Sequence, residues 1–433
     1  MHPIKTLLES RRHGKKTGIY SACTASPEVI FAVCEAAKES NTLALVEATA
    51  NQVNQFGGYT GMRPADYAAF VKEIAKEAGL PLDRLVLGGD HLGPLTWQNL
   101  PEVEAMANAR ELIAQYVAAG FTKIHIDTSM RLADDDKNAR LSDAVIARRG
   151  AELAAVAEAA FVKLTEQNPN AVHPIYCIGS EVPIPGGAQE HEGISVTSPA
   201  DFKASVQAFY DAFEAAGVLS AWPYVTGVVV QPGVEFGDDN VDEYNREAAK
   251  ELTKALAEFP SMVFEGHSTD YQTKYKLKEL VEDGVAILKV GPGLTFALRE
   301  GYFALEHIEQ ALLPQYPALT PSCYAETLDR VMVEDPGNWA KYYHGTKAEQ
   351  DFKRKYSFSD RCRYYFPQEE VKKAAERLLS NLEAMRIPLS LLSQYMPIQY
   401  IRVREGKLPL TPRALLLDRV KHCIEDYLFA VTD

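Results

Sequence analysis

An alternation of short apolar runs with longer amphipathic segments constrains the fold of this chain more than any other feature. The alternation recurs about eight times before residue 310. Each apolar run is bounded by glycine, proline or charge, which predicts a buried strand, and the segments between them carry apolar residues at helical spacing. The predicted strands are residues 18–23, 43–49, 85–89, 123–128, 174–179, 227–231, 262–266 and 286–290. Strands separated by helices predict a parallel sheet, because a parallel connection needs a crossover.

Eight such units fit an α/β fold of the (β/α)8 TIM-barrel type, which takes about 250 residues plus insertions. An open doubly wound sheet is the alternative. The first strand is followed by the sequence SACTAS at residues 21–26, which lacks the GxGxxG turn of a dinucleotide-binding sheet. We therefore predict a barrel over residues 1–310 that carries the active-site face.

The alternation stops near residue 311, and residues 311–433 are predicted to form a helical extension packed on the barrel. Nine prolines separate its helical patterns. Residues 356–366 combine aromatic side chains with two arginines. This stretch either caps the barrel mouth, meets a partner or packs against the barrel in the ordinary way, and the sequence leaves these alternatives open.

Charge and cysteine content narrow the classes of function. Forty-five Lys and Arg stand against 59 Asp and Glu, a net charge of −14, which disfavours binding to nucleic acid and to anionic membrane surfaces. The first 16 residues contain no apolar core of a signal peptide. Six scattered cysteines show no CxxC spacing, so neither a disulfide framework nor a cysteine metal site is expected. We expect a cytoplasmic protein that forms a homo-oligomer.

Polar residues follow seven of the predicted strands, where a barrel places its active site. His91 and His267 follow strands three and seven, and with Glu181 after strand five they form the expected ligand set for a catalytic divalent metal, most often zinc. For either histidine alone, a structural or acid–base role is the simpler interpretation. Asp90 is the expected general acid/base; its alternative role is to orient His91. Asp127 and Glu181 complete the expected catalytic carboxylates.

Substrate contacts are expected from the loops around this face. Lys289 could form a Schiff base, but a positive charge for an anion is the simpler role. Gly291 and Gly293 sit where barrels commonly bind phosphate through backbone N–H groups, although a tight turn would look the same. Asn51 and Gln55 lie in an amide-rich loop suited to sugar hydroxyls or to an ordinary surface. The expected substrate-binding set also contains Glu47, Gln231 and Asp270.

Long sequence stretches carry a family resemblance at these same positions. They are EATANQVNQFGGYTGM at 47–62, LGGDHLGP at 87–94, KIHIDTSM at 123–130, SEVPIPGG at 180–187, VVQPGVEF at 229–236, EGHSTDYQT at 265–273, AILKVGPGLTFALRE at 286–300 and SFSDRCRYYFP at 357–367. Over essentially its whole length the chain resembles the Z-type subunits of class II tagatose-1,6-bisphosphate aldolases. The resemblance implies a (β/α)8 barrel and a place in galactitol, tagatose or N-acetylgalactosamine breakdown.

The family leaves the activity open. Its members have been described as non-catalytic partners that stabilise a smaller zinc-dependent aldolase subunit, have carried the name tagatose-6-phosphate kinase, and include tagatose-6-phosphate 4-epimerases. No GxxxxGK[ST] loop supports a kinase. The aldolase partner's pattern of three zinc histidines and a DH dyad is matched by Asp90, His91 and His267, but the strand-six position holds Gln231.

We predict a metal-dependent 4-epimerase that interconverts tagatose 6-phosphate and fructose 6-phosphate. Ionisable groups at several strand ends would cost desolvation free energy in an inert site, which favours an enzyme. The alternative is a non-catalytic subunit whose barrel stabilises a separate class II aldolase chain.

Overall fold

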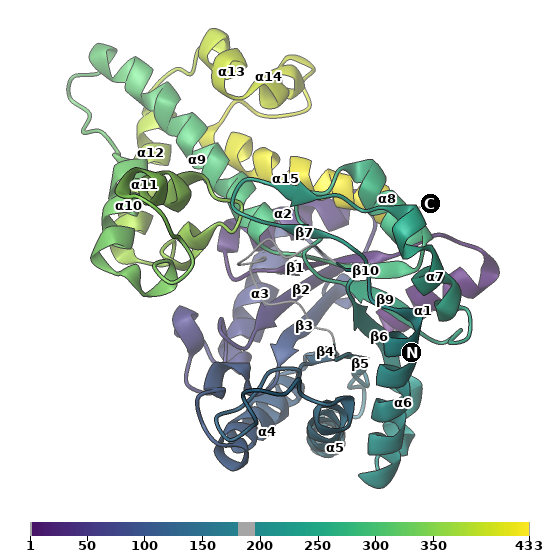
Figure 1. Ribbon diagram of the computed structural model, residues 1–433. Helices are drawn as coiled ribbons and strands as arrows, with labels where there is room; N and C mark the ends of the chain where they lie inside the picture. The colour runs from purple at the N-terminus through teal and green to yellow at the C-terminus, as the bar shows by residue number, and fades with distance from the viewer. Residues whose placement is uncertain (1, 181–194, 433) are drawn as a thin grey trace.

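The computed structural model describes residues 2–180 and 195–432, and it confirms the predicted barrel. Eight parallel strands close in the order β1-β10-β9-β6-β5-β4-β3-β2 (Figure 1). They are β1 Ile19–Cys23, β2 Ala44–Thr49, β3 Leu85–Leu92, β4 Lys123–Ile126, β5 Ile175–Ile178, β6 Val225–Val230, β9 Val263–Gly266 and β10 Val285–Val290. A small antiparallel pair, β7 Glu235–Phe236 and β8 Val241–Asp242, follows β6 and was not predicted.

Helices cover the outside of the barrel because each one buries one apolar face against the strands. They are α2 Pro27–Ser40, α3 Pro64–Ala78, α4 Glu102–Ala118, α5 Asp143–Gln167, α6 Pro199–Ala215, α7 Arg246–Leu256, α8 Lys274–Glu282 and α9 Pro292–Leu312. Local sequence sets their starts. Proline occupies the first turn of α2, α3, α6 and α9, and the side chains of Ser142, Ser198, Asn245 and Thr273 cap α5, α6, α7 and α8.

Strand β3 extends three residues beyond its predicted end at residue 89. Thr49 of β2 pairs with Asp90, and Ile126 of β4 pairs with Leu92, so neighbours on both sides continue the ladder. Asp90 and His91 therefore belong to the strand itself. Their positions are fixed by the sheet, which gives them more rigidity than loop residues would have.

The N-terminal end of the barrel is closed by a short helix, α1 (Pro3–Glu9). Its Ile4 and Leu8 pack into an apolar layer inside the barrel formed by Ile19, Leu45, Val86, Ile175, Cys177, Val263, Ala286 and Ile287. His2 caps this helix, because its Nδ1 accepts from the N–H of Ile4 at 3.1 Å. Burial lowers the pKa of His2 to about 4.

This cap predicts an acid-sensitive contribution to stability. Unfolded His2 titrates near pH 6.5 and folded His2 near 4, so its contribution is present above pH 6.5 and is lost as the pH falls towards 4. The loss amounts to as much as about 3 kcal/mol. His2→Asn keeps an oxygen that can cap the helix but has no group that titrates in this range. We therefore expect the thermal midpoint of the variant to fall less between pH 7 and pH 5 than that of the wild type. Equal falls in wild type, His2→Asn and the exposed-site control His13→Asn would contradict the assignment.

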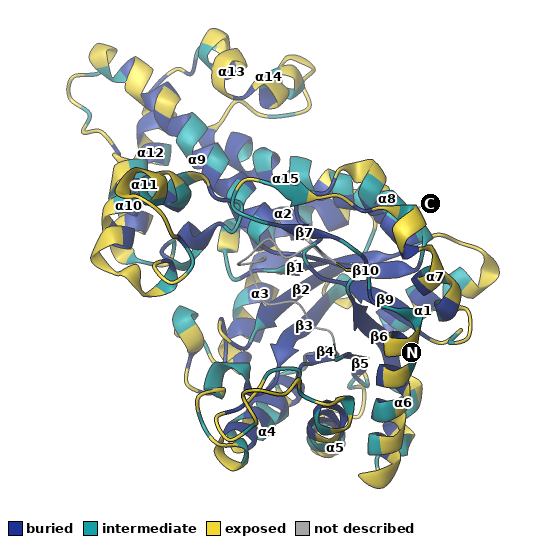
Figure 2. Ribbon diagram, in the orientation of Figure 1, coloured by how far each residue is buried: buried dark blue, intermediate teal, exposed yellow. Residues whose placement is uncertain are grey.

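Beyond the barrel the chain is helical, and Figure 2 shows that these helices bury part of their surface and expose the rest. The helices are α10 Tyr324–Glu334, α11 Lys347–Tyr356, α12 Glu369–Ala384, α13 Leu389–Tyr395, α14 Pro397–Arg404 and α15 Pro412–Val431. In the described part of the chain, no helix combines the length and the apolar character that a membrane span requires.

The last helix, α15, lies in the outer layer of the barrel and packs against α2, α8 and α9 (Figure 1). The N–H of Gly18 donates to the carbonyl of Val431 at 3.0 Å, and the Tyr427 hydroxyl donates to the carbonyl of Thr269 at 2.9 Å. Leu415, Leu416, Val420 and Ile424 are buried beneath it. The helix therefore shares its core with strands β1 and β10, which lie more than 120 residues before it.

Because of this shared core, we expect a cavity in α15 to destabilise the whole barrel. Ile424→Ala should cost about 2–5 kcal/mol and should lower a single cooperative transition followed by circular dichroism and by tryptophan fluorescence. Ile401→Ala on α14 is the matched control, because Ile401 is exposed. A separate early transition of residues 311–433 in Ile424→Ala would show instead that this segment unfolds on its own.

Candidate functional site

Three histidines converge inside the C-terminal mouth of the barrel. His91 stands near the end of β3, His125 on β4 and His267 directly after β9. Their ring centroids are 4.9–5.0 Å apart, and all three side chains are buried. Together with Asp90 they offer nitrogen and oxygen atoms that lie within 4.8 Å of one another. A cluster of this composition can hold a divalent cation.

Each histidine has one ring nitrogen held by a carboxylate. His91 Nδ1 lies 2.8 Å from Asp127 Oδ2, His125 Nδ1 lies 2.9 Å from Asp90 Oδ1, and His267 Nε2 lies 3.1 Å from Glu265 Oε1. An ionised carboxylate only accepts hydrogen bonds, so the nitrogens of His91 and His267 carry the protons, whereas His125 Nδ1 also accepts from the backbone N–H of His91 at 3.1 Å. The other nitrogen of the His91 and His267 rings can offer a lone pair when the ring is neutral, which is how proteins prepare histidines for a metal.

The unpaired nitrogen of His125 is a further feature of this cluster. His125 Nε2 is buried and has no hydrogen-bond partner among the described residues. Burial of an unpaired polar atom costs about 1–3 kcal/mol, and a ligand at the centre of the cluster would recover this cost. Burial also lowers the pKa of His267 to about 3, which keeps that imidazole neutral as a metal ligand must be.

Backbone strain at the same place supports a functional role. His91 has φ of 48° and Ser268 has φ of 53°, both in the left-handed region that non-glycine residues rarely adopt. Strain of this kind costs about 1–3 kcal/mol per residue and concentrates at functional sites. One of the two residues belongs to the cluster, and the other directly follows His267.

The predicted ligand set is only partly within the described structure. His91 and His267 come together as expected, whereas Glu181 lies outside the described residues. The third histidine of the cluster, His125, was not assigned from the sequence, although it falls in a predicted strand. Alternation along that strand is the signal that could have found it, because Lys123, His125 and Asp127 all point to one side.

Asp127 orients the ring of His91 in the structure. Burial raises its pKa, but the hydrogen bond to His91 outweighs this and lowers the pKa of Asp127 to about 2. The N–H and hydroxyl of Ser129 donate to its other oxygen at 3.1 and 2.7 Å. An ionised Asp127 therefore fixes the His91 ring and leaves Nε2 facing the cluster.

Beneath the histidines lies a layer of buried ion pairs. Lys123 binds Glu47 at 3.0 Å and Glu265 at 2.6 Å, and Lys289 binds Glu47 closely and Asp90 at 2.8 Å. Burial lowers the pKa of Lys289, but the carboxylates, first of all Asp90, raise it well above its usual range. Lys289 is thus a fixed ammonium ion, which disfavours the Schiff-base role and favours a purely electrostatic one.

Asp90 contacts both the histidines and the buried Lys289. His91 and Lys289 outweigh its burial and hold its pKa well below the usual range. Its Oδ1 is shared by His125 and Lys289, while Oδ2 lies 3.8 Å from His91 Nε2. Asp90 is therefore an ionised oxygen donor at the edge of the cluster.

The glycine turn after β10 is filled by a side chain. Asp270 Oδ1 accepts from the N–H groups of Gly291 and Gly293 at 2.9 and 2.7 Å. Burial raises the pKa of Asp270 to about 6. The backbone donors that were expected to meet a phosphate are thus occupied by the chain's own carboxyl group.

The other expected substrate contacts are divided. Asn51 lines the pocket over the histidines, together with its neighbour Gln52. Gln55 donates to the carbonyl of Asn108 at 3.0 Å, and Gln231 accepts from the N–H groups of its own turn, at Gly233 and Val234. Gln55 and Gln231 line neither of the pockets described below.

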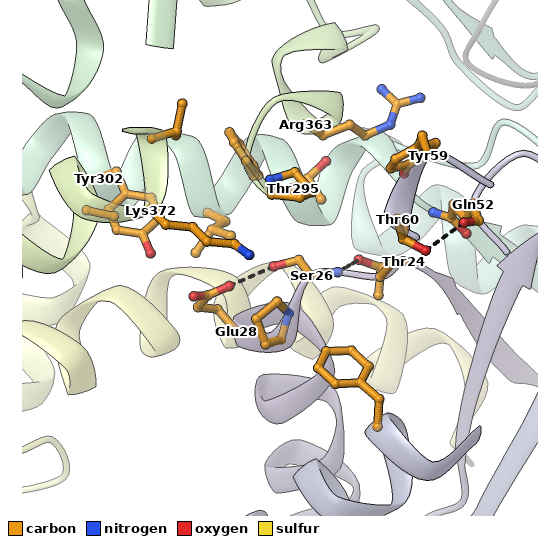
Figure 3. Close-up of a pocket in the computed structure, with 18 of the residues that line it drawn as sticks. Thr24, Ser26, Glu28, Gln52, Tyr59, Thr60, Thr295, Tyr302, Arg363 and Lys372 are labelled. Carbon is orange, nitrogen blue, oxygen red and sulfur yellow. Dashed lines mark hydrogen bonds between the residues drawn. The ribbon is translucent and has the colours of Figure 1, made fainter. Parts of the chain in front are cut away.

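Two neighbouring pockets open at this end of the barrel. The first, of about 90 Å³, lies over His91, His267 and Asp90; the second, of about 470 Å³, lies between the barrel and α12 (Figure 3). They share four lining residues: Cys23, Gln52, Tyr59 and Arg363. The two pockets therefore share one wall, and the smaller of them is lined by His91 and His267 of the histidine cluster.

The aromatic and arginine stretch at 356–366 lies over this mouth. Arg363 and Tyr364 line the smaller pocket, and Tyr364 packs edge-on against Tyr59 with ring centroids 4.8 Å apart. Of the three interpretations of this stretch, the cap of the barrel mouth describes its place. The segment beyond the barrel therefore contributes to the site, which the alternation of strands and helices did not indicate.

Comparison with known proteins gives the family. The model of the D-tagatose-1,6-bisphosphate aldolase subunit GatZ/KbaZ-like family matches residues 4–432. The chain belongs to this family. A crystal structure of a probable tagatose 6 phosphate kinase from Sinorhizobium meliloti 1021 is 46% identical to this GatZ/KbaZ-like chain, covering 96% of it and 100% of its own length, with a TM-score of 0.86.

More distant matches of the GatZ/KbaZ-like chain are aldolases. The YdjI aldolase from Escherichia coli K12 is 12% identical, covers 88% of the chain and 98% of its own, and has a TM-score of 0.40. The fructose-bisphosphate aldolase of Campylobacter jejuni is 15% identical, covers 88% of the chain and 91% of its own, and has a TM-score of 0.41.

The cluster predicts metal binding that depends on all three histidines. We expect His125→Ala to abolish retention of zinc after dialysis, measured by elemental analysis, because a four-donor set would lose a ligand. Asp127→Asn should weaken zinc affinity by about 10–100-fold, because His91 loses its orienting acceptor. The control is His422→Ala on the outer helix α15, which should retain wild-type zinc. Full zinc content in His125→Ala would exclude His125 as a ligand.

Proposed function

We propose that this chain is a divalent-metal-dependent 4-epimerase, with zinc as the metal, that interconverts D-tagatose 6-phosphate and D-fructose 6-phosphate. The observation that carries the proposal is the cluster of three histidines, each with one ring nitrogen beside a carboxylate oxygen, next to the ionised Asp90. Such a site fits chemistry at a carbonyl and its neighbouring hydroxyl groups.

Names of relatives favour the substrate class. The description of the family names a tagatose-1,6-bisphosphate aldolase subunit, and the name of the relative at 46% identity contains tagatose 6-phosphate. Both names point to a phosphorylated tagatose. Phosphoryl transfer from a nucleotide is disfavoured in this chain, because its sequence contains no GxxxxGK[ST] loop.

Epimerisation at C4 follows from reversible cleavage of the C3–C4 bond. The Asp90 carboxylate takes the proton of the C4 hydroxyl, C4 becomes an aldehyde carbon, and the electron pair of the broken bond stays on the ketone-bearing fragment. When the aldehyde turns its other face and the bond re-forms, Asp90 returns the proton and the configuration at C4 is inverted. A bound divalent ion would supply electrophilic stabilisation for the charge on the ketone fragment.

Surrounding residues fix the orientation and charge of these groups. Lys289 and His125 hold Asp90 ionised and in place, and Asp127 and Glu265 hold the rings of His91 and His267. Tyr59 and Tyr364 meet across the mouth, where they would hinder the aldehyde fragment from leaving between the two half-reactions. Retention of both fragments is what separates an epimerase from an aldolase.

The second candidate function is a non-catalytic subunit that stabilises a class II aldolase chain. The description of the family as an aldolase subunit favours it. The buried charges speak for an active site instead, since ion pairs and an unpaired imidazole nitrogen inside a barrel cost free energy that apolar residues would not. The two functions would use different parts of the molecule.

Substitution of Asp90 separates the two candidates. Asp90→Asn preserves the shape and an oxygen for His125 but removes the proton acceptor, so we expect conversion of tagatose 6-phosphate by the zinc-loaded chain, followed by NMR, to fall by about 10²–10⁴-fold. Zinc content is measured in the same sample to exclude metal loss. Asp211→Asn, on the outer helix α6, is the control with unchanged turnover.

The alternative predicts a different result from the same proteins. A stabilising subunit would lengthen the half-life of aldolase activity in a mixture, and Asp90→Asn would leave that effect intact, because an interface depends on anchors elsewhere. Absence of turnover by the wild type with tagatose 6-phosphate and with its 1,6-bisphosphate, together with a longer half-life, would overturn the epimerase proposal.

A further inference from the structure

We infer that Arg363, supplied by the segment beyond the barrel, binds the phosphate group of the substrate. The inference rests on the proposed function for its substrate class and extends it by naming the cation that recognises the anionic end. Arg363 belongs to neither the histidine cluster nor the buried ion pairs, and it lines both pockets of the mouth.

The guanidinium is held firmly by neutral groups. Its Nη1 donates to the carbonyls of Ser359 at 2.5 Å and Asp360 at 2.9 Å, and its Nη2 donates to the Tyr364 hydroxyl at 3.2 Å. The side chain is thereby fixed beside Tyr59, and it extends away from Lys372 on the other side of the larger pocket (Figure 3). Fixing an arginine in advance reduces the entropy lost when it binds.

Its positive charge has no carboxylate partner within ion-pair distance among the described residues. Asp360, which precedes it, is bound by Thr295 at 2.6 Å and pairs with Arg299 at 3.7 Å. Asp270 is bound by the two glycine N–H groups of the turn. The charge of this half-buried guanidinium is therefore available to an anion that enters the pocket from solution.

Other cations around the mouth are less suited to this role. Lys289 is surrounded by Glu47, Asp90 and Glu265. The backbone donors of Gly291 and Gly293 already hold Asp270, so a phosphate there would have to displace a carboxyl group and would meet its charge. Arg363 is therefore the cation of the smaller pocket that remains available to an anion.

The donors left on Arg363 match a phosphate. A guanidinium has five N–H groups, and three are used in the bonds to Ser359, Asp360 and Tyr364. The Nε–H and one Nη2–H remain for an anion. A guanidinium can offer two N–H groups to two phosphate oxygens, which the single ammonium of a lysine in the same place does less well.

Binding measurements on the zinc-loaded full chain test the assignment apart from turnover. Titration calorimetry compares D-fructose 6-phosphate with D-fructose in the wild type, Arg363→Met, Arg363→Lys and Lys372→Met. We expect the wild type to prefer the phosphorylated sugar, and Arg363→Met to lose about 10–100-fold of affinity for it with little change for free fructose. Arg363→Lys should recover part of the loss. Lys372→Met, which removes a cation from the opposite side of the larger pocket, should keep the wild-type preference.

Three other outcomes would overturn the inference, and a fourth would overturn only the proposed function. If Arg363→Met keeps the wild-type preference for fructose 6-phosphate, Arg363 does not bind the phosphate. If Arg363→Met loses equal affinity for both sugars, or has a lowered thermal midpoint, Arg363 has a packing role instead. A wild type without preference would exclude phosphate recognition altogether. A wild type that prefers fructose 6-phosphate through Arg363 but does not epimerise it would leave this inference standing and would defeat the proposed function.

Discussion

The buried ion pairs between Glu47, Glu265, Lys123 and Lys289 are the constraint on which the upper half of the barrel depends. Four charged side chains from four strands meet where an ordinary barrel would bury branched apolar residues. Removal of any one of them would leave the remaining buried groups with an uncompensated charge in a medium of low polarity, at a cost of several kcal/mol. The layer therefore works only as a complete set, and the histidines above it rest on groups whose places are already determined.

This layer also divides the barrel into two functional levels. Below it, α1 and the inward apolar residues of six strands form a dry core that contributes stability. Above it, the inward positions carry His125, Asp90 and the rings of His91 and His267. Charges in the middle level set the charges of the upper one, because Lys289 keeps Asp90 ionised and Glu265 decides which nitrogen of His267 carries the proton. The buried ion pairs thus determine the charge and protonation of the groups at the barrel mouth.

The sequence predicted the barrel well because strand and helix periodicity are local properties. It also brought His91 and His267 to one face, since strand ends share that face in any barrel. It did not assign His125, because a histidine within a four-residue strand resembles a core residue until its neighbours are known. The positions of Asp270 in the glycine turn and of Arg363 over the mouth depend on contacts between residues that are far apart in the sequence. Such choices are made by tertiary packing, and no local pattern records them.

The position of α15 has a consequence for how the protein is made. The helix that covers β1 begins only at Pro412, and the N–H of Gly18 is paired only when Val431 is present. On a ribosome, the first strand emerges long before its covering helix has been translated. The barrel can therefore reach its final closed form only after α15 has left the ribosome, with β1 uncovered on this side in the meantime.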